Sequence, residues 1–139
     1  TEIQGTTTSG DMDGSDNWAE VCKVDPNATV YPATNYPAFN FANTYGITAG
    51  FTDTDYKNGW YLPSMAELYQ IDKKRSVIQE GLTATGGFTI VTTSHCWSSS
   101  QSDSHYEDVY ESYFNSSIVN ASYKYNGLNV LVVQAFNAQ

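Results

Sequence analysis

The chain has 139 residues, the size of one domain with room for a hydrophobic core. Its 15 acidic and 6 basic residues give a formal net charge of −9. Nucleic-acid binding needs a positive footprint, which is missing here, and anionic membrane surfaces are disfavoured for the same reason. No apolar run approaches the roughly 20 residues that span a bilayer. Few lysines, many Ser, Thr, Asn and Tyr residues and the negative charge suit an exported protein.

The first residues divide into a lead-in and an acidic turn. Residues 1–10 are rich in Thr and Gly and predict a frayed lead-in or an edge strand, so that one domain occupies residues 11–139. Three carboxylates then follow within six residues, on Asp11, Asp13 and Asp16. They are a calcium candidate, because hard cations bind clustered oxygen atoms, although the spacing is not that of an EF-hand. A solvated acidic turn is the alternative.

Two short elements are expected before residue 50. Residues 18–24 predict a strand with Trp18 and Val21 turned inward. Residues 36–46 predict a helix, because Pro37 suits the first helical position and Gly46 suits the residue past the end.

A capping box marks the next helix. Ser64 follows Pro63 and stands three residues before Glu67, so the hydroxyl and the carboxylate can each bond a backbone amide at the helix start. Ser76 and Gln79 repeat this pattern and predict a third helix that stops at Gly86.

The remainder of the chain has strand character. We expect strands over residues 88–93, around Trp97, over 108–114 and over 118–125, then a turn at Asn126-Gly127. Residues 128–136 predict a closing strand, and the apolar run 130–133 is typical of a strand buried on both faces. Helices followed by an antiparallel meander predict an α+β domain.

Two motifs carry a family resemblance. Gly59-Trp60-x-Leu62-Pro63 with Glu67, followed by Trp97-Ser98-Ser99-Ser100, resembles bacterial domains of the C-type lectin-like fold, in the branch of the formylglycine-generating enzymes. Within that branch the chain is similar, over about residues 11–137, to exported variable domains and to ligand-binding proteins diversified by retroelements. The resemblance implies short helices in the first two-thirds, packed on a small twisted antiparallel sheet formed mainly by the C-terminal third.

Catalysis is not expected. The resemblance implies that the oxidase needs a close pair of reactive cysteines and that its iron-dependent relatives need several histidines. Cys22, Cys96, His95 and His105 fit neither pattern, so we expect no cofactor, with calcium as the weak exception. A disulfide between the two cysteines and two separate buried thiols both remain open. The tripeptides of calcium-dependent sugar binding in animal relatives do not occur.

The functional prediction rests on residues 101–128, which are rich in Ser, Tyr and Asn and resemble the variable segment of retroelement-diversified proteins. Tyrosine supplies large amphipathic contacts at low entropy cost, and small polar residues supply adaptable hydrogen bonds. We therefore expect a non-catalytic ligand-binding module at the bacterial surface, such as an adhesin, whose ligand is a protein or a glycan. The alternatives are a structural domain without its own ligand and, third, an oxidase-type enzyme. The expected ligand-binding residues are Ser102, Asp103, Ser104, His105, Tyr106, Glu111, Tyr113, Asn120, Ser122, Tyr123, Tyr125 and Asn126.

Overall fold

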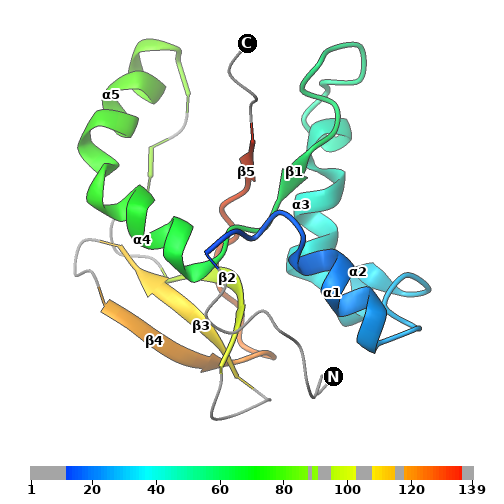
Figure 1. Cartoon of the computed structure of the whole chain (residues 1–139). Coiled ribbons are helices and arrows are strands. Elements are labelled where there is room, and N and C mark those ends of the chain that lie inside the picture. The colour runs from blue at the N-terminus through cyan, green and yellow to red at the C-terminus, as the bar shows by residue number, and fades with distance from the viewer. Residues whose placement is uncertain (1–11, 88, 91–94, 103–107, 115–117, 136–139) are drawn as a thin grey trace.

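The structure is a computed structural model of the whole chain, and it describes residues 12–87, 89–90, 95–102, 108–114 and 118–135. Within these ranges it is a mixed α+β protein with five helices and two small antiparallel sheets, which confirms the predicted α+β class (Figure 1). The helices are α1 (Asn17–Val24), α2 (Pro32–Asn35), α3 (Pro37–Thr48), α4 (Met65–Lys73) and α5 (Arg75–Ala84). The strands are β1 (Trp60–Tyr61), β2 (His95–Gln101), β3 (Asp108–Tyr113), β4 (Ile118–Tyr123) and β5 (Val133–Gln134).

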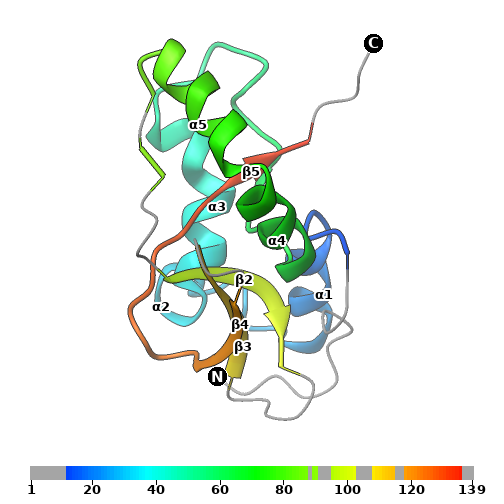
Figure 2. The same ribbon diagram turned by 90° about the vertical axis from the view of Figure 1, so that its left-hand side faces the viewer.

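The larger sheet has the strand order β2-β3-β4, and the smaller one pairs β1 with β5. The short β1–β5 pair lies between two groups of helices, α1–α3 on one side and α4–α5 on the other (Figure 1). Figure 2 shows the three-stranded sheet beneath α4 and α5. The sheet therefore lies at one end of the molecule, with β4 as its outermost strand.

Strand β2 separates two apolar clusters. Cys96 belongs to a cluster with Leu68, Ile90 and Phe114, against which side chains of α4 and α5 pack. Trp97 points to the opposite face of the strand and packs in a second cluster with Leu62, which follows β1, and with Ala42 of α3. Because both faces of β2 are covered, this strand is the buried centre of the fold.

The segment after β4 differs from the prediction. In place of one strand over residues 128–136, it makes an isolated bridge between Asn129 and Cys96, followed by the two-residue β5. Its side chains still alternate, because Leu128, Val130 and Val132 pack on the Trp97 cluster while Leu131 packs on the other. The segment is therefore packed on both sides in part, as expected. Side-chain packing, and not a continuous ladder of backbone hydrogen bonds, holds it in place.

The strand predicted over residues 18–24 is wrong, since this segment is α1. Trp18, Val21 and Cys22 lie three and four positions apart, and a helix turns all three toward a cluster that contains Ala28 and Tyr36. The helix predicted over residues 36–46 is confirmed as α3 with Pro37 at its start, but its predicted end is wrong, because the helix continues to Thr48 and Gly46 lies buried inside it.

Two details of the later elements are also corrected. Helix α5 begins at Arg75 with Lys74 as its N-cap residue and no side-chain cap, so Ser76 forms no capping box. The turn after β4 lies earlier than Asn126-Gly127, because the amide of Asn126 donates to the carbonyl of Tyr123 at 2.9 Å. The strand expected over residues 88–93 lies outside the described residues except at positions 89 and 90.

Candidate functional site

The two resemblance motifs contact each other where β2 meets the N-terminus of α4. The amide of Ser99 donates to the carbonyl of Pro63 at 2.8 Å, and the Ser100 hydroxyl accepts from the amide of Met65 at 2.9 Å. These bonds attach β2 directly to the N-terminus of α4. The serines that follow Trp97 therefore satisfy backbone groups at a buried junction.

The Glu67 carboxylate completes this junction. It accepts hydrogen bonds from the amides of Ser64 and Gly14 at 2.8 and 2.9 Å and from the Tyr61 hydroxyl at 2.7 Å. The Ser64 hydroxyl accepts from the Glu67 amide, so the predicted capping box is confirmed. A Cβ atom on Gly14 would lie 2.5 Å from the Leu62 carbonyl oxygen, so this position accepts only glycine without rearrangement.

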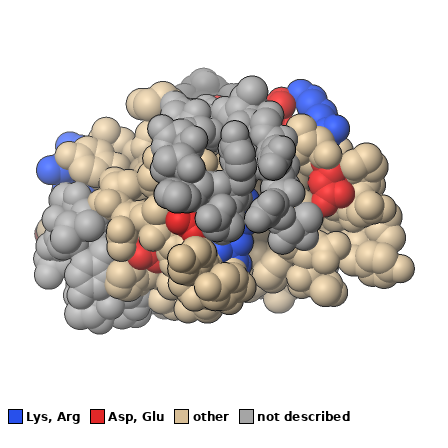
Figure 3. Space-filling model, turned by 90° about the horizontal axis from the view of Figure 1, so that it is seen from below, with Lys and Arg blue, Asp and Glu red and all other residues tan. Residues whose placement is uncertain are grey.

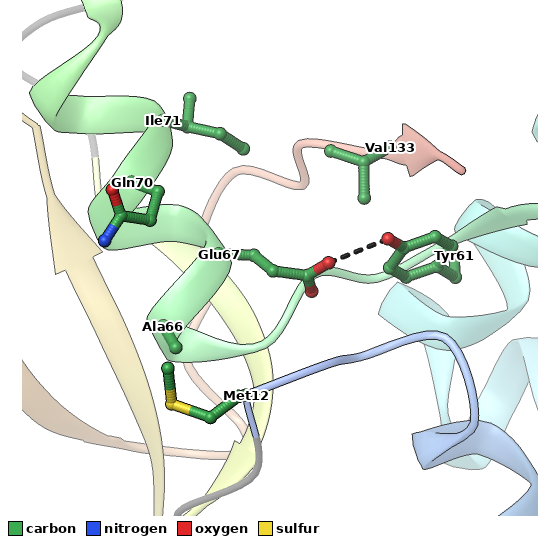
Figure 4. Close-up of a pocket in the computed structure, with 7 residues that line it drawn as sticks. All are labelled: Met12, Tyr61, Ala66, Glu67, Gln70, Ile71 and Val133. Atoms are coloured by element: carbon green, nitrogen blue, oxygen red, sulfur yellow. Dashed lines mark hydrogen bonds between the residues drawn. The ribbon is translucent and has the colours of Figure 1, made fainter. Parts of the chain in front are cut away.

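A pocket of about 310 Å³ opens beside this junction. Figure 4 shows Glu67 of α4 and Tyr61 of β1 pointing toward each other across it, with Ile71 and Val133 above. Met12, Ala66 and Gln70 complete the lining. The Glu67 carboxylate already accepts three hydrogen bonds. A ligand in this pocket would therefore contact mainly apolar side chains.

The predicted binding residues that lie together are those of β4 and the turn after it. Asn120, Tyr123, Tyr125 and Asn126 are exposed, and Ser122 is half-buried. The rings of Tyr123 and Tyr125 stack with their centroids 5.1 Å apart and an interplanar angle of 7°, while 49% and 80% of the two residues remain exposed. We call Asn120, Ser122, Tyr123, Tyr125 and Asn126 the tyrosine surface.

Two side-chain hydrogen bonds hold the tyrosine surface in place. The Asn126 amide group donates to the Ser122 hydroxyl at 2.9 Å, which ties the turn to the strand. Lys124 donates to the side-chain oxygen of Gln101 at 3.3 Å, which ties the turn to β2. The turn is therefore held to two strands of the sheet.

The prediction of an outward-facing Glu111 is wrong. Only 4% of this residue is exposed, and its Oε1 atom lies 2.8 Å from Nδ1 of His95. Strand β3 is the central strand, with Trp97 opposite Glu111 on one side and Asn120 opposite it on the other. The same face carries the Trp97 cluster, which covers the carboxylate.

Ser102 is likewise buried rather than presented to a ligand, and its amide donates to the carbonyl of Asp108 at 3.1 Å. Asp103, Ser104, His105 and Tyr106 lie outside the described residues, as does the side chain of Tyr113. Val119, which is not among the expected ligand-binding residues, is 46% exposed on β4. Its exposure follows from the place of β4 at the edge of the sheet.

The remaining candidates concern metals, thiols and membranes. Asp11 lies outside the described residues, Asp13 and Asp16 are exposed, and no group of three potential metal ligands occurs in the described part of the chain. Cys22 and Cys96 are both free, and burial raises the pKa of the Cys96 thiol to about 11. None of the helices described is both long enough and apolar enough to cross a membrane.

Comparison with known proteins adds no relative, since no family model, curated protein or solved structure matches the chain.

Proposed function

We propose that the protein is a non-catalytic ligand-binding module of an exported bacterial protein, and that the tyrosine surface contacts a protein or glycan ligand. The stacked pair of Tyr123 and Tyr125 carries this proposal. The two rings stack face to face, so their outer faces and edges stay open as an amphipathic contact area, and each ring has only two side-chain torsions to fix on binding. A monomer gains nothing in its own core from rings placed this way.

The surroundings of the pair favour recognition through shape and hydrogen bonds. Asn120 and Ser122, which alternate with Tyr123 and therefore lie on the other face of β4, and Asn126 of the turn supply uncharged donors and acceptors. Lys124 is the one charged residue in the segment 118–127. On the face of the molecule seen in Figure 3, the charged side chains among the described residues are few and scattered. A surface fixed on a hydrogen-bonded sheet also loses little entropy when a ligand binds.

As part of the same proposal, the domain has the C-type lectin-like fold, and a retroelement diversifies the segment that contains the tyrosine surface. The contact between the two motifs supports this proposal, because Ser99 and Ser100 bond directly to Pro63 and Met65. Residues far apart in the sequence thus form one junction, as motifs of a common fold do. A near-copy of the DNA for residues 100–130 beside a reverse transcriptase gene, differing mainly at adenines, is the expected genomic sign.

The test compares three variants of the purified chain on a glycan array and on a displayed library of linear peptides. Tyr123→Ala and Tyr125→Ala should each weaken binding of the selected ligand about tenfold or more, because a buried aromatic contact contributes 1–2 kcal/mol or more (roughly) at an interface. The matched control is Tyr31→Ala, since Tyr31 is 65% exposed but lies between α1 and α2, far from the strand in sequence.

Thermal unfolding should be nearly unchanged in all three variants, because each ring is exposed. If every selected ligand binds the two Tyr123 and Tyr125 variants as tightly as the parent, the proposal is wrong. If neither library yields a ligand, the domain has a structural role in a larger surface protein.

A further inference from the structure

Within the described residues, the backbone groups along the outer edge of β4 have no partner strand. All six residues of β4 pair with β3, from Asp108 opposite Tyr123 to Tyr113 opposite Ile118, and no other described strand pairs with β4. In an antiparallel ladder, every second residue turns its N–H and C=O groups away from the neighbouring strand. Figure 1 shows β4 as the outermost strand of its sheet, so these groups face away from β3.

The opposite edge of the same sheet is occupied. Along β2, the amide of Trp97 donates to the carbonyl of Asn129 at 2.9 Å, and the amide of Asn129 donates to the carbonyl of His95 at 3.0 Å. The chain thus covers one sheet edge with its own backbone, and the described residues leave the other edge uncovered.

The residues of β4 themselves also lack the usual features that protect an edge strand against pairing. Natural edge strands carry lysine, proline or a bulge that prevents another strand from adding. Residues 118–123 contain no charged residue and no proline, and their register with β3 is unbroken. The β2–β3 pairing, by contrast, has an irregularity between Trp97 and Gln101. An uncharged edge of unbroken register, with Val119 and Tyr123 exposed, is suited to strand addition.

We propose that the ligand of the tyrosine surface is an extended polypeptide segment of another protein, which joins the sheet as a further strand along β4. This proposal rests on the proposed function and narrows its ligand to one class. An extended backbone repeats its donors and acceptors with the spacing of the strand it joins, about 3.3 Å per residue, whereas a glycan has no such repeat. At the end of the added strand, Tyr123 and Tyr125 receive one side chain.

Charge favours an uncharged or basic segment over a second copy of this chain. A second copy would bring another net charge of −9 to the interface. On the strand next to β4, the half-buried Asp108 lies opposite Tyr123. A carboxylate so close to the edge repels an acidic segment and attracts lysine or arginine.

The probe is a linear peptide of about twelve residues, selected from a random displayed library on the immobilised chain and then synthesised. Two further versions carry N-methyl groups on alternate amides, one version for each set. Since only one set can donate to β4, N-methylation of that set should weaken binding about tenfold or more, and N-methylation of the other set should change it little. Basic residues should be enriched in the selected peptides.

A variant tests the protein side of the same contact. Ala121→Lys places a charge on the exposed edge and should weaken binding of the peptide about tenfold. The control is Ser76→Lys on α5, an exposed position outside the sheet, which should bind as the parent does. Amide hydrogen exchange should show the outward amides of β4 open in the free protein and protected in the complex.

Three results would overturn strand addition. Strand addition is wrong if a peptide needs Tyr123 and Tyr125 for binding but still binds when either set of its amides is N-methylated. The proposed function stands in that case. Slow exchange of every β4 amide in the free protein would mean that a second copy or another segment of the chain covers the edge. A glycan as the only ligand that depends on the tyrosines would also exclude it. A complete lack of tyrosine-dependent ligands instead removes the proposed function itself.

Discussion

At the scale of the residue, Glu67 joins segments that are far apart in the sequence. Its carboxylate links Gly14, 53 positions away, with Tyr61 and the start of α4. Burial, followed by the hydrogen bond to Glu67, raises the pKa of the Tyr61 hydroxyl well above its usual range. The pKa of Tyr36 is raised in the same direction by burial and by its hydrogen bond to Asp25. Both phenols therefore favour the folded state while they are protonated.

Alkaline pH should reveal this contribution at Tyr61. A group whose pKa is higher in the folded protein stabilises it fully below the unfolded pKa, about 10 for tyrosine, and the contribution is lost as pH rises toward the folded value. Tyr61→Phe should lower the free energy of unfolding by about 1 kcal/mol at neutral pH and flatten its decline above about pH 10. Urea unfolding across this range measures both effects. Tyr31→Phe is the exposed control, and an equally steep decline in Tyr61→Phe would refute the assignment.

At the scale of the element, two serines with the same local pattern have different roles. Ser64 caps α4 with its hydroxyl, whereas Ser76 is exposed inside α5, which starts one residue earlier. Sequence predicts the first correctly because Pro63 and the capping box act within a few residues. It fails at Ser76 because α5 continues almost directly from α4 through Lys74, which gives Ser76 no helix start to cap.

Alanine at the two positions should separate these roles. Ser64→Ala should lower the free energy of unfolding by about 1–2 kcal/mol, because the cap is lost and the site is buried. Ser76→Ala should change it by less than about 0.5 kcal/mol, because alanine suits an exposed helix interior. Chemical denaturation of both variants gives the comparison. Equal losses would contradict the capping geometry.

The elements that sequence misassigned depended on long-range packing. Residues 18–24 are too few for periodicity to separate a helix from a strand, and the cluster with Ala28 and Tyr36 decides for a helix. The segment 128–132 has the alternation of a strand, yet the ladder forms only where Asn129 meets β2. The local sequence pattern does not specify which other strand a segment pairs with.

At the scale of the whole molecule, the same limit applies to the candidate site. Alternation along β3 correctly places Glu111 and Tyr110 on opposite faces, but which face is covered depends on α3 and on residues 128–132. The Ser-, Tyr- and Asn-rich composition of residues 101–128 predicts a surface, and Tyr123 and Tyr125 are indeed exposed. The position of β4 at the sheet edge, and therefore the exposure of Val119, could be known only from the assembled sheet.

The reactivity of the two cysteines tests how the apolar clusters are packed. They belong to different apolar clusters, Cys22 to that of α1 and Cys96 to that beneath α4 and α5. The pKa of the Cys96 thiol, about 11, leaves little thiolate at neutral pH, and the side chain is buried. A thiol reagent should therefore modify Cys22, which is half-buried, well before Cys96.

Modification of Cys96 requires its cluster between the sheet and α4–α5 to open, so its rate should follow unfolding as urea is added. Mass spectrometry of the labelled protein over time gives both rates, and Cys22→Ser isolates the slower one. Because neither cysteine is in a disulfide, a reductant should leave the unfolding midpoint unchanged. A lower midpoint in reductant, or labelling of Cys96 as fast as that of Cys22, would mean that the cluster of α1 and the cluster beneath α4 and α5 are not separate units.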